Sequence, residues 1–175
     1  MKRLGWVLLL ILFVVPLSSD FAVAAEPLYR QSPFDEIKLD DTNNGAVLKV
    51  KPLDLFERKL PPLAKRTGEL EVELLERPGE KFSLPWVNIV DIKLYEDRVL
   101  TEAETQAAAG KFDEAQASLR FLEQKYPQVS RLAEVIENFL WLQIIGAFRA
   151  SKHDEALTLL VELHRRNPQR TGLAT

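Results

Sequence analysis

The sequence predicts an α+β protein: an N-terminal signal peptide at residues 1–25, a small antiparallel β module at 26–97, and α-helical hairpins at 98–175. Three observations predict this organisation. The first residues have the charge and hydropathy pattern of an export signal. Apolar residues then alternate with polar ones up to about residue 97, as in half-buried strands. Beyond that point the apolar residues recur at helical spacing, in a segment that contains an internal sequence repeat.

Residues 1–25 contain the three parts of a secretory signal. Lys2 and Arg3 form the positive start, residues 6–17 form a 12-residue apolar stretch, and small residues permit cleavage after Ala24 or Ala25. A helix of that length spans only ~18 Å, which is less than the ~30 Å hydrocarbon core of a bilayer. We therefore expect an exported protein without stable membrane insertion after cleavage. The absence of cysteine favours a bacterial periplasm, and membrane anchoring by an uncleaved signal is the alternative.

The β module is predicted from alternating apolar stretches separated by turn formers. The turn signals are Asn43-Asn44-Gly45 and Arg77-Pro78-Gly79-Glu80, and residues 59–68, which contain two prolines, are expected to form a loop. The expected strands cover residues 37–39, 46–50, 70–74, 82–86 and 90–94. Five short strands in about 60 residues predict a strongly bent antiparallel sheet or an SH3-like barrel.

An internal repeat predicts the helical half. Residues 110–134 match residues 151–175 at ten of 25 positions when the sequence is shifted by 41. A fixed period of this size is typical of stacked helical hairpins. Glycine or serine ends one helix, alanine lets two helices approach closely, leucine follows at i+4 on the same face, and proline ends the second helix. The positions that define the repeat are Gly110, Phe112, Ala115, Leu119, Pro127, Ala156, Leu160 and Pro168.

This half resembles the tetratricopeptide repeat family. Gly110-x-Phe112-x-x-Ala115, followed by Leu119 and Pro127, is similar to the second-helix signature of that family, and residues 141–148 are similar to its first-helix ladder. The resemblance covers roughly residues 98–175. It implies helical hairpins that bind a protein or peptide partner.

A second resemblance covers more of the chain. The pattern Pro85-Trp86-x-x-Ile89-Val90-x-Ile92-x-Leu94, followed by residues 110–115, looks like the N-terminal region of exported bacterial solute- or peptide-binding proteins of ABC transport. This resemblance implies an alternative function, an N-terminal accessory region of such a periplasmic protein. The repeat also places Leu173-Ala174 where Leu132-Ala133 open a helix, so we expect a fragment of a longer protein, or else an open end covered by a partner.

The composition argues against nucleic-acid binding and against catalysis. The 23 Lys+Arg and 26 Asp+Glu residues give a net charge of −3, without the excess of cations that phosphate binding needs. The chain has no cysteine, its two histidines lack a metal-ligand spacing, and it contains neither a Gly-x-Ser-x-Gly elbow nor a glycine-rich phosphate loop. His153 takes the place of Phe112 and is expected to be a packing residue. We therefore expect a protein that is not an enzyme and has no cofactor and no metal.

The remaining function class is a non-catalytic scaffold that binds a protein or peptide through shape and apolar contact. In stacked hairpins the first helix of each pair lines the inner side. The expected interaction surface consists of Thr101, Glu104, Ala108, Asn138, Trp141 and Ile145. The most apolar stretch, residues 139–148, is expected to form a central buried helix, or alternatively to meet another chain or a following helix.

Overall fold

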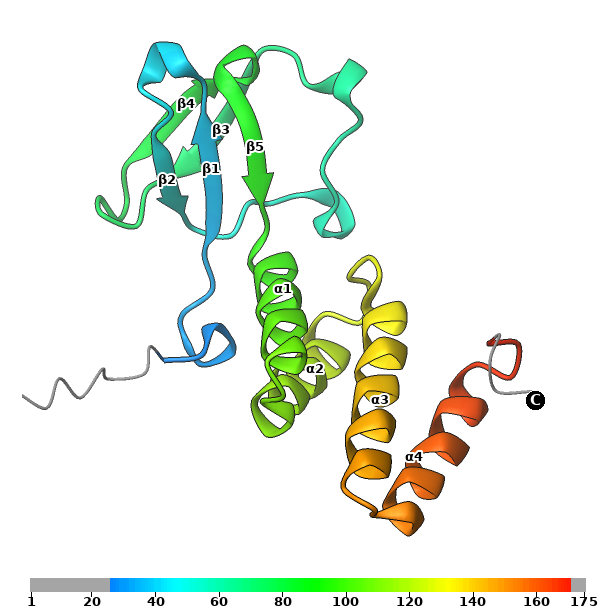
Figure 1. The fold of residues 1–175 in the computed structure, drawn as a ribbon. Coiled ribbons are helices and arrows are strands. Elements are labelled where there is room, and N and C mark those ends of the chain that lie inside the picture. Colours follow the sequence, from blue (N-terminus) through cyan, green and yellow to red (C-terminus); the bar gives the residue numbers. More distant parts are fainter. Residues whose placement is uncertain (1–25, 171–175) are drawn as a thin grey trace, which may run out of the picture.

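The computed structural model describes residues 26–170, in which five strands precede four helices (Figure 1). The expected α+β class is confirmed. The predicted signal at residues 1–25 and the last five residues lie outside the described part of the chain. Within the described part, no helix combines the length and the apolar character needed to cross a membrane.

The strands lie close to the stretches that alternation predicts. They are β1 (Asp35–Leu39), β2 (Val47–Val50), β3 (Glu69–Glu73), β4 (Lys81–Pro85) and β5 (Ile89–Lys93). They form two antiparallel sheets, with the orders β2-β1-β5 and β3-β4. A bridge between Val50 and Leu74 links β2 to the end of β3. The strands therefore follow one another in the order β5-β1-β2-β3-β4, with a bend at the link between the two sheets.

The alternation places one face of each strand in a shared core. Ile37 pairs with Leu48 on β2 and with Ile92 on β5, and its side chain is completely buried. Val50 and Val72 join this core from the other strands. The connection from β2 to β3 contains only two short 3₁₀ turns, as expected for a segment with several prolines.

The helices form two pairs, joined by short loops. They are α1 (Tyr95–Ala108), α2 (Phe112–Lys125), α3 (Leu132–Arg149) and α4 (His153–Arg166). Helix α1 packs on α2, α3 packs on α4, and α3 also lies against both helices of the first pair. Helix α1 begins at Tyr95, directly after β5, and so starts before the predicted change at residue 98.

The two copies of the repeat have the same local structure where their sequences match. Helices α2 and α4 both have 14 residues and begin 41 positions apart. Two residues after the end of the preceding helix, the chain has positive φ at Gly110 (φ 76°) in one copy and at Ser151 (φ 59°) in the other. In each loop the next N–H group, of Lys111 or Lys152, donates to a carbonyl five residues earlier, at 2.9 Å. This is the arrangement of a Schellman C-cap, which requires the left-handed conformation.

The other positions that define the repeat also have the expected environments. Ala115 and Ala156 are buried, which permits the close approach of paired helices. Leu119 is buried and Leu160 is half-buried, while Pro127 and Pro168 follow the ends of α2 and α4. The leucine environments differ because α3 covers the first helix pair, whereas no described helix covers the second.

Candidate interaction surface

The structure does not gather the six predicted surface residues into one site. Trp141 and Ile145, on α3, line an apolar groove between α3 and α4. Thr101, on α1, lines a separate depression beside the β module. Ala108 is exposed at the end of α1. The side chain of Glu104 accepts a hydrogen bond from Arg131 at 2.8 Å, so α1 and α3 are linked there by an ion pair.

The segment that follows α4 folds back onto α3 and contacts the polar end of the predicted surface. Arg170 donates to Asn138 and to Glu137, each at 3.1 Å. Its guanidinium carbon lies 6.0 Å from the centre of the Trp141 ring, which places the cation over the aromatic face. The side chain of Asn138 is therefore already hydrogen-bonded to another residue of the same chain. Sequence spacing could not reveal this, because Arg170 is distant from α3 along the chain.

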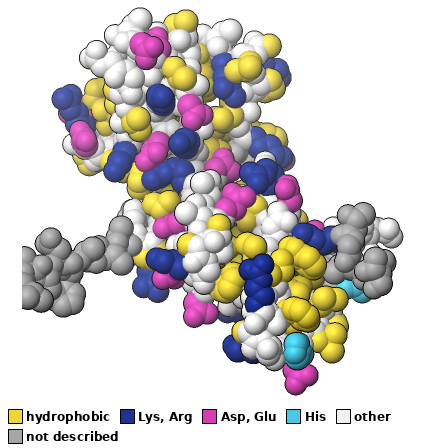
Figure 2. All heavy atoms as spheres, viewed as in Figure 1, with side chains coloured by type: hydrophobic (Ala, Val, Ile, Leu, Met, Phe, Trp, Pro, Cys, Tyr) yellow, Lys and Arg dark blue, Asp and Glu magenta, His cyan; other side chains and the backbone are white. Residues whose placement is uncertain are grey.

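The groove between α3 and α4 is lined mainly by apolar side chains. It has a volume of about 410 Å³, and its lining includes Trp141, Ile144, Ile145, Phe148, Leu157 and Leu160. Phe148 is 65% exposed, Leu157 63% and Val161 62%. Figure 2 shows hydrophobic side chains gathered over the α3–α4 end of the molecule, with cationic side chains beside them. Singly exposed apolar residues are common on proteins, whereas an apolar cluster of this kind is typical of an interaction site.

Residues 139–148 are mostly buried or half-buried, and α3 is exposed at its C-terminal end. Phe139, Leu140 and Ile144 are buried, as in a central helix, because α3 packs between the first pair and α4. Phe148 is exposed and its ring contacts the ring of His153 edge to face, with the centres 5.5 Å apart. His153 is itself exposed, so it contributes to the open face and is not enclosed in the core.

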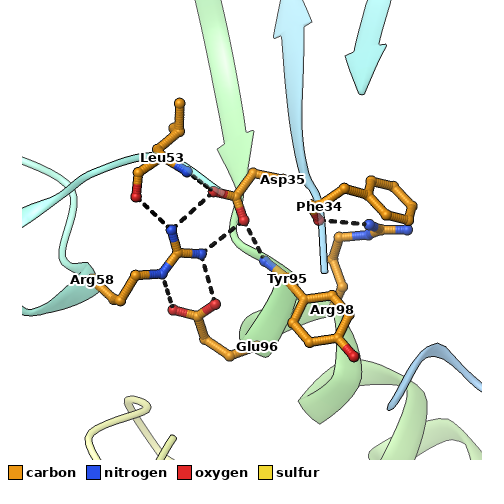
Figure 3. A network of polar contacts seen from close by, with 7 residues as sticks. All are labelled: Phe34, Asp35, Leu53, Arg58, Tyr95, Glu96 and Arg98. Carbon is orange, nitrogen blue, oxygen red and sulfur yellow. Dashed lines mark hydrogen bonds and ion pairs between the residues drawn. The ribbon is translucent and has the colours of Figure 1, made fainter. Parts of the chain in front are cut away.

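A buried ion network holds the β module to the helices (Figure 3). The Arg58 guanidinium donates to both carboxylate oxygens of Glu96, at 2.9 and 2.8 Å, and to both of Asp35, at 3.1 and 2.8 Å. It also donates to the Leu53 carbonyl at 2.7 Å. Asp35 lies on β1, Glu96 lies in the first turn of α1, and Arg58 lies in the long β2–β3 connection. One side chain therefore ties three segments together.

The electrostatics of this network suit a structural role. Asp35 is fully buried and Glu96 is 2% exposed, so both carboxylates depend on their donors. Asp35 also accepts from the backbone N–H groups of Leu53 and Tyr95, and the latter bond caps the start of α1. Burial alone would lower the pKa of Arg58, but the hydrogen bonds that its guanidinium donates to Glu96 and Asp35 raise it above its ordinary value. The guanidinium is held charged and fully engaged, so it is not free to bind a ligand.

The hollow beside this network is lined by Glu57, Arg58, Glu96 and Asp97 among others, and its volume is about 380 Å³. Burial, and then the neighbouring Glu96 charge, raise the pKa of Asp97. The sequence analysis missed this network altogether. A single carboxylate at the start of a strand and a single arginine in a proline-containing loop give no periodic or motif signal that joins them.

The described residues contain no group of three or more metal-ligating side chains that could hold a metal ion. No protein-family model, no curated protein and no solved structure matches this chain.

Proposed function

We propose that this chain is an exported, non-catalytic interaction module that binds another polypeptide through the apolar groove of α3 and α4. The observation that carries the proposal is the exposure of three apolar side chains, each above 60%. Phe148 and Leu157 line the groove, and Val161 follows Leu157 one turn later on α4. Water contact at these side chains is unfavourable, and a partner that covers them removes that cost.

The free energies of burial and of association indicate how much of the groove a partner must cover. Burying an apolar side chain of this size stabilises by about 1.5–3 kcal/mol, so the exposed parts of these three supply roughly 3–6 kcal/mol. Association itself costs at least about 4 kcal/mol in lost freedom of motion. The three side chains therefore give little net affinity by themselves. A specific complex also needs the half-buried Trp141, Ile145 and Leu160 at the base of the groove.

The architecture supports a scaffold role. Two helix pairs with matching C-cap loops support a tetratricopeptide-like arrangement for the helical half. The bent strand order β5-β1-β2-β3-β4 supports an SH3-like β module. The Arg58 network fixes that module to the first turn of α1, so the helices project from a firmly attached base. Export to the periplasm rests on the sequence of residues 1–25.

Site-specific photocrosslinking in the native host tests this function. A photoreactive amino acid at Leu157 should give covalent adducts with another polypeptide. The matched control is the same amino acid at Val87, which is 85% exposed on the β module. Adducts at residue 157 and none at residue 87 support the proposal. Equal labelling at the two positions, or no adduct at residue 157, contradicts it.

A further inference from the structure

The groove on α3 and α4 occupies the positions that the first helix pair uses to pack against α3. Seven apolar residues line the groove. A shift of 41 residues carries Ile145 and Leu157 onto the polar Glu104 and Gln116, and the other five onto Leu100, Ala103, Ala107, Ala115 and Leu119. All five are buried and belong to the same core cluster as the first half of α3. The groove is thus the second copy of a face that, in the first copy, is covered by a helix.

The covering contact in the first copy shows which kind of helix fits this face. Phe112, at the position of His153, packs edge to face against Phe139 of α3, with the ring centres 6.1 Å apart. Helix α3 buries Leu132, Val135, Ile136 and Phe139 along one side. These residues follow the i, i+3, i+4, i+7 spacing of an amphipathic helix.

The second copy is more apolar than the first at the edge of this face. Leu157 stands where the first copy has Gln116, and Val161 stands where it has Arg120. In the first copy these edge positions carry polar side chains, which water can solvate. In the second copy the same positions carry exposed hydrophobic side chains. The apolar face that a partner can cover is therefore wider than the face beneath α3.

The charge of the groove further restricts the kind of partner that can bind there. Its lining contains Arg149 and His153 and no carboxylate. Arg149 forms no ion pair with any of the described residues. The equivalent positions of the first copy, Ala108 and Phe112, carry no charge. Acidic side chains on a partner would therefore meet Arg149 at this groove, a cation that pairs with none of the described carboxylates.

We propose that the groove of α3 and α4 binds an amphipathic helix of a partner protein, with α3-like apolar spacing and acidic residues along its flank. This inference rests on the proposed function, since it names the class of polypeptide that the groove accepts. The helix lies between α3 and α4 as α3 lies between α1 and α2. The acidic flank lies toward Arg149.

Three synthetic peptides test the inference against the full chain. The first carries Leu, Val, Ile and Phe at the spacing of Leu132, Val135, Ile136 and Phe139, with glutamates on the flanks. The second has lysines at the flank positions, and the third is a scrambled form of the first. Fluorescence anisotropy should show saturable binding of the glutamate peptide, affinity at least about tenfold weaker for the lysine peptide, and no saturation for the scrambled one.

Two groove variants and one control assign the binding to the groove. Leu157→Glu should abolish binding of the glutamate peptide while leaving the circular dichroism spectrum unchanged, because the side chain is 63% exposed. Val90→Glu, at a site 60% exposed on β5, is the matched control and should bind as the original chain does. Arg149→Glu should reverse the preference between the glutamate and lysine peptides.

The outcomes separate this inference from the proposed function. Absence of peptide binding, or equal binding of the glutamate and scrambled peptides, overturns the helix inference, even where crosslinks at Leu157 still support an interaction module. A dimer in sedimentation that is lost in Leu157→Glu overturns it as well, because the occupant is then a second copy. Peptide binding without crosslinks in the native host contradicts the proposed function and leaves the specificity of the groove established.

Discussion

Replacing Arg58 with methionine should destabilise the junction between the β module and the helices more than any surface substitution. Methionine keeps much of the apolar stem of the side chain but removes every donor. Asp35 retains two backbone N–H donors, whereas Glu96 loses both of the hydrogen bonds that hold its carboxylate. The variant thus leaves a buried, uncompensated carboxylate in the first turn of α1.

The expected loss follows from that burial. Removing one partner of a buried ion pair costs about 3–5 kcal/mol, because the remaining charge stays desolvated. In a chain of this size each kcal/mol corresponds to about 2–4 °C in the unfolding midpoint, so Tm should fall by roughly 6–20 °C.

Urea unfolding followed by circular dichroism measures this loss. Arg77→Met is the matched control, because Arg77 faces Glu80 at 3.9 Å with both side chains 63% exposed. The control should lie within about 0.5 kcal/mol of the original chain. The double variant Arg58→Met with Glu96→Gln should lose less than the sum of the two single losses, by at least about 1 kcal/mol.

A result in which Arg58→Met is no less stable than Arg77→Met would refute the reasoning. It would mean that the buried carboxylates do not depend on the guanidinium. If the loss of stability in the double variant equals the sum of the two single losses, Arg58 and Glu96 act independently. The network would then not be what holds the β module to the helices.

Four further substitutions and one control test the helical half and the start of α1. Ala115→Leu should cost about 1–3 kcal/mol by overfilling a fully buried position, while Ala108→Leu, at an exposed position, should leave the urea midpoint nearly unchanged. Gly110→Ala should lower the free energy of unfolding by about 1 kcal/mol, and Ser151→Gly should raise it by up to about 1 kcal/mol, because both positions have positive φ. Urea unfolding that shows both free energies changing in the same direction, or each in the direction opposite to the expected one, would contradict this. Burial raises the pKa of Tyr95 to about 12, so the folded state holds this proton more tightly than the unfolded state. Its contribution to stability is complete below the ordinary tyrosine pKa of about 10 and falls as the pH rises towards 12. Melting curves of Tyr95→Phe should therefore show a smaller loss of stability over that range, and an unchanged slope would count against the shift.

Local patterns in the sequence predicted most of the secondary structure. Each alternating stretch lies within or next to a strand, because the two-residue period reports which face is buried. The matching Gly110 and Ser151 loops were predicted because a C-cap depends on a few adjacent residues. The start of α1 was placed at residue 98 instead of Tyr95, because Leu94 continues the alternating strand pattern up to the residue before the helix.

The interaction surface was predicted less well. Of the residues predicted for it, Trp141 and Ile145 line the apolar groove, whereas the exposed Phe148, Leu157 and Val161 were not included in the predicted surface. Spacing along a helix shows which residues share a face. It does not show whether a neighbouring helix covers that face.

The sequence by itself determined the order of elements, the two-fold repeat and the residue types at each helix end, since these depend on contacts between near neighbours. Only the tertiary structure decided that Asp35, Arg58 and Glu96 meet in one buried network. It also decided that equivalent apolar positions differ, with Leu119 buried beneath α3 and Leu160 open at the groove. The physical reason is that burial depends on which distant segment packs on a face, and a local pattern does not encode that segment.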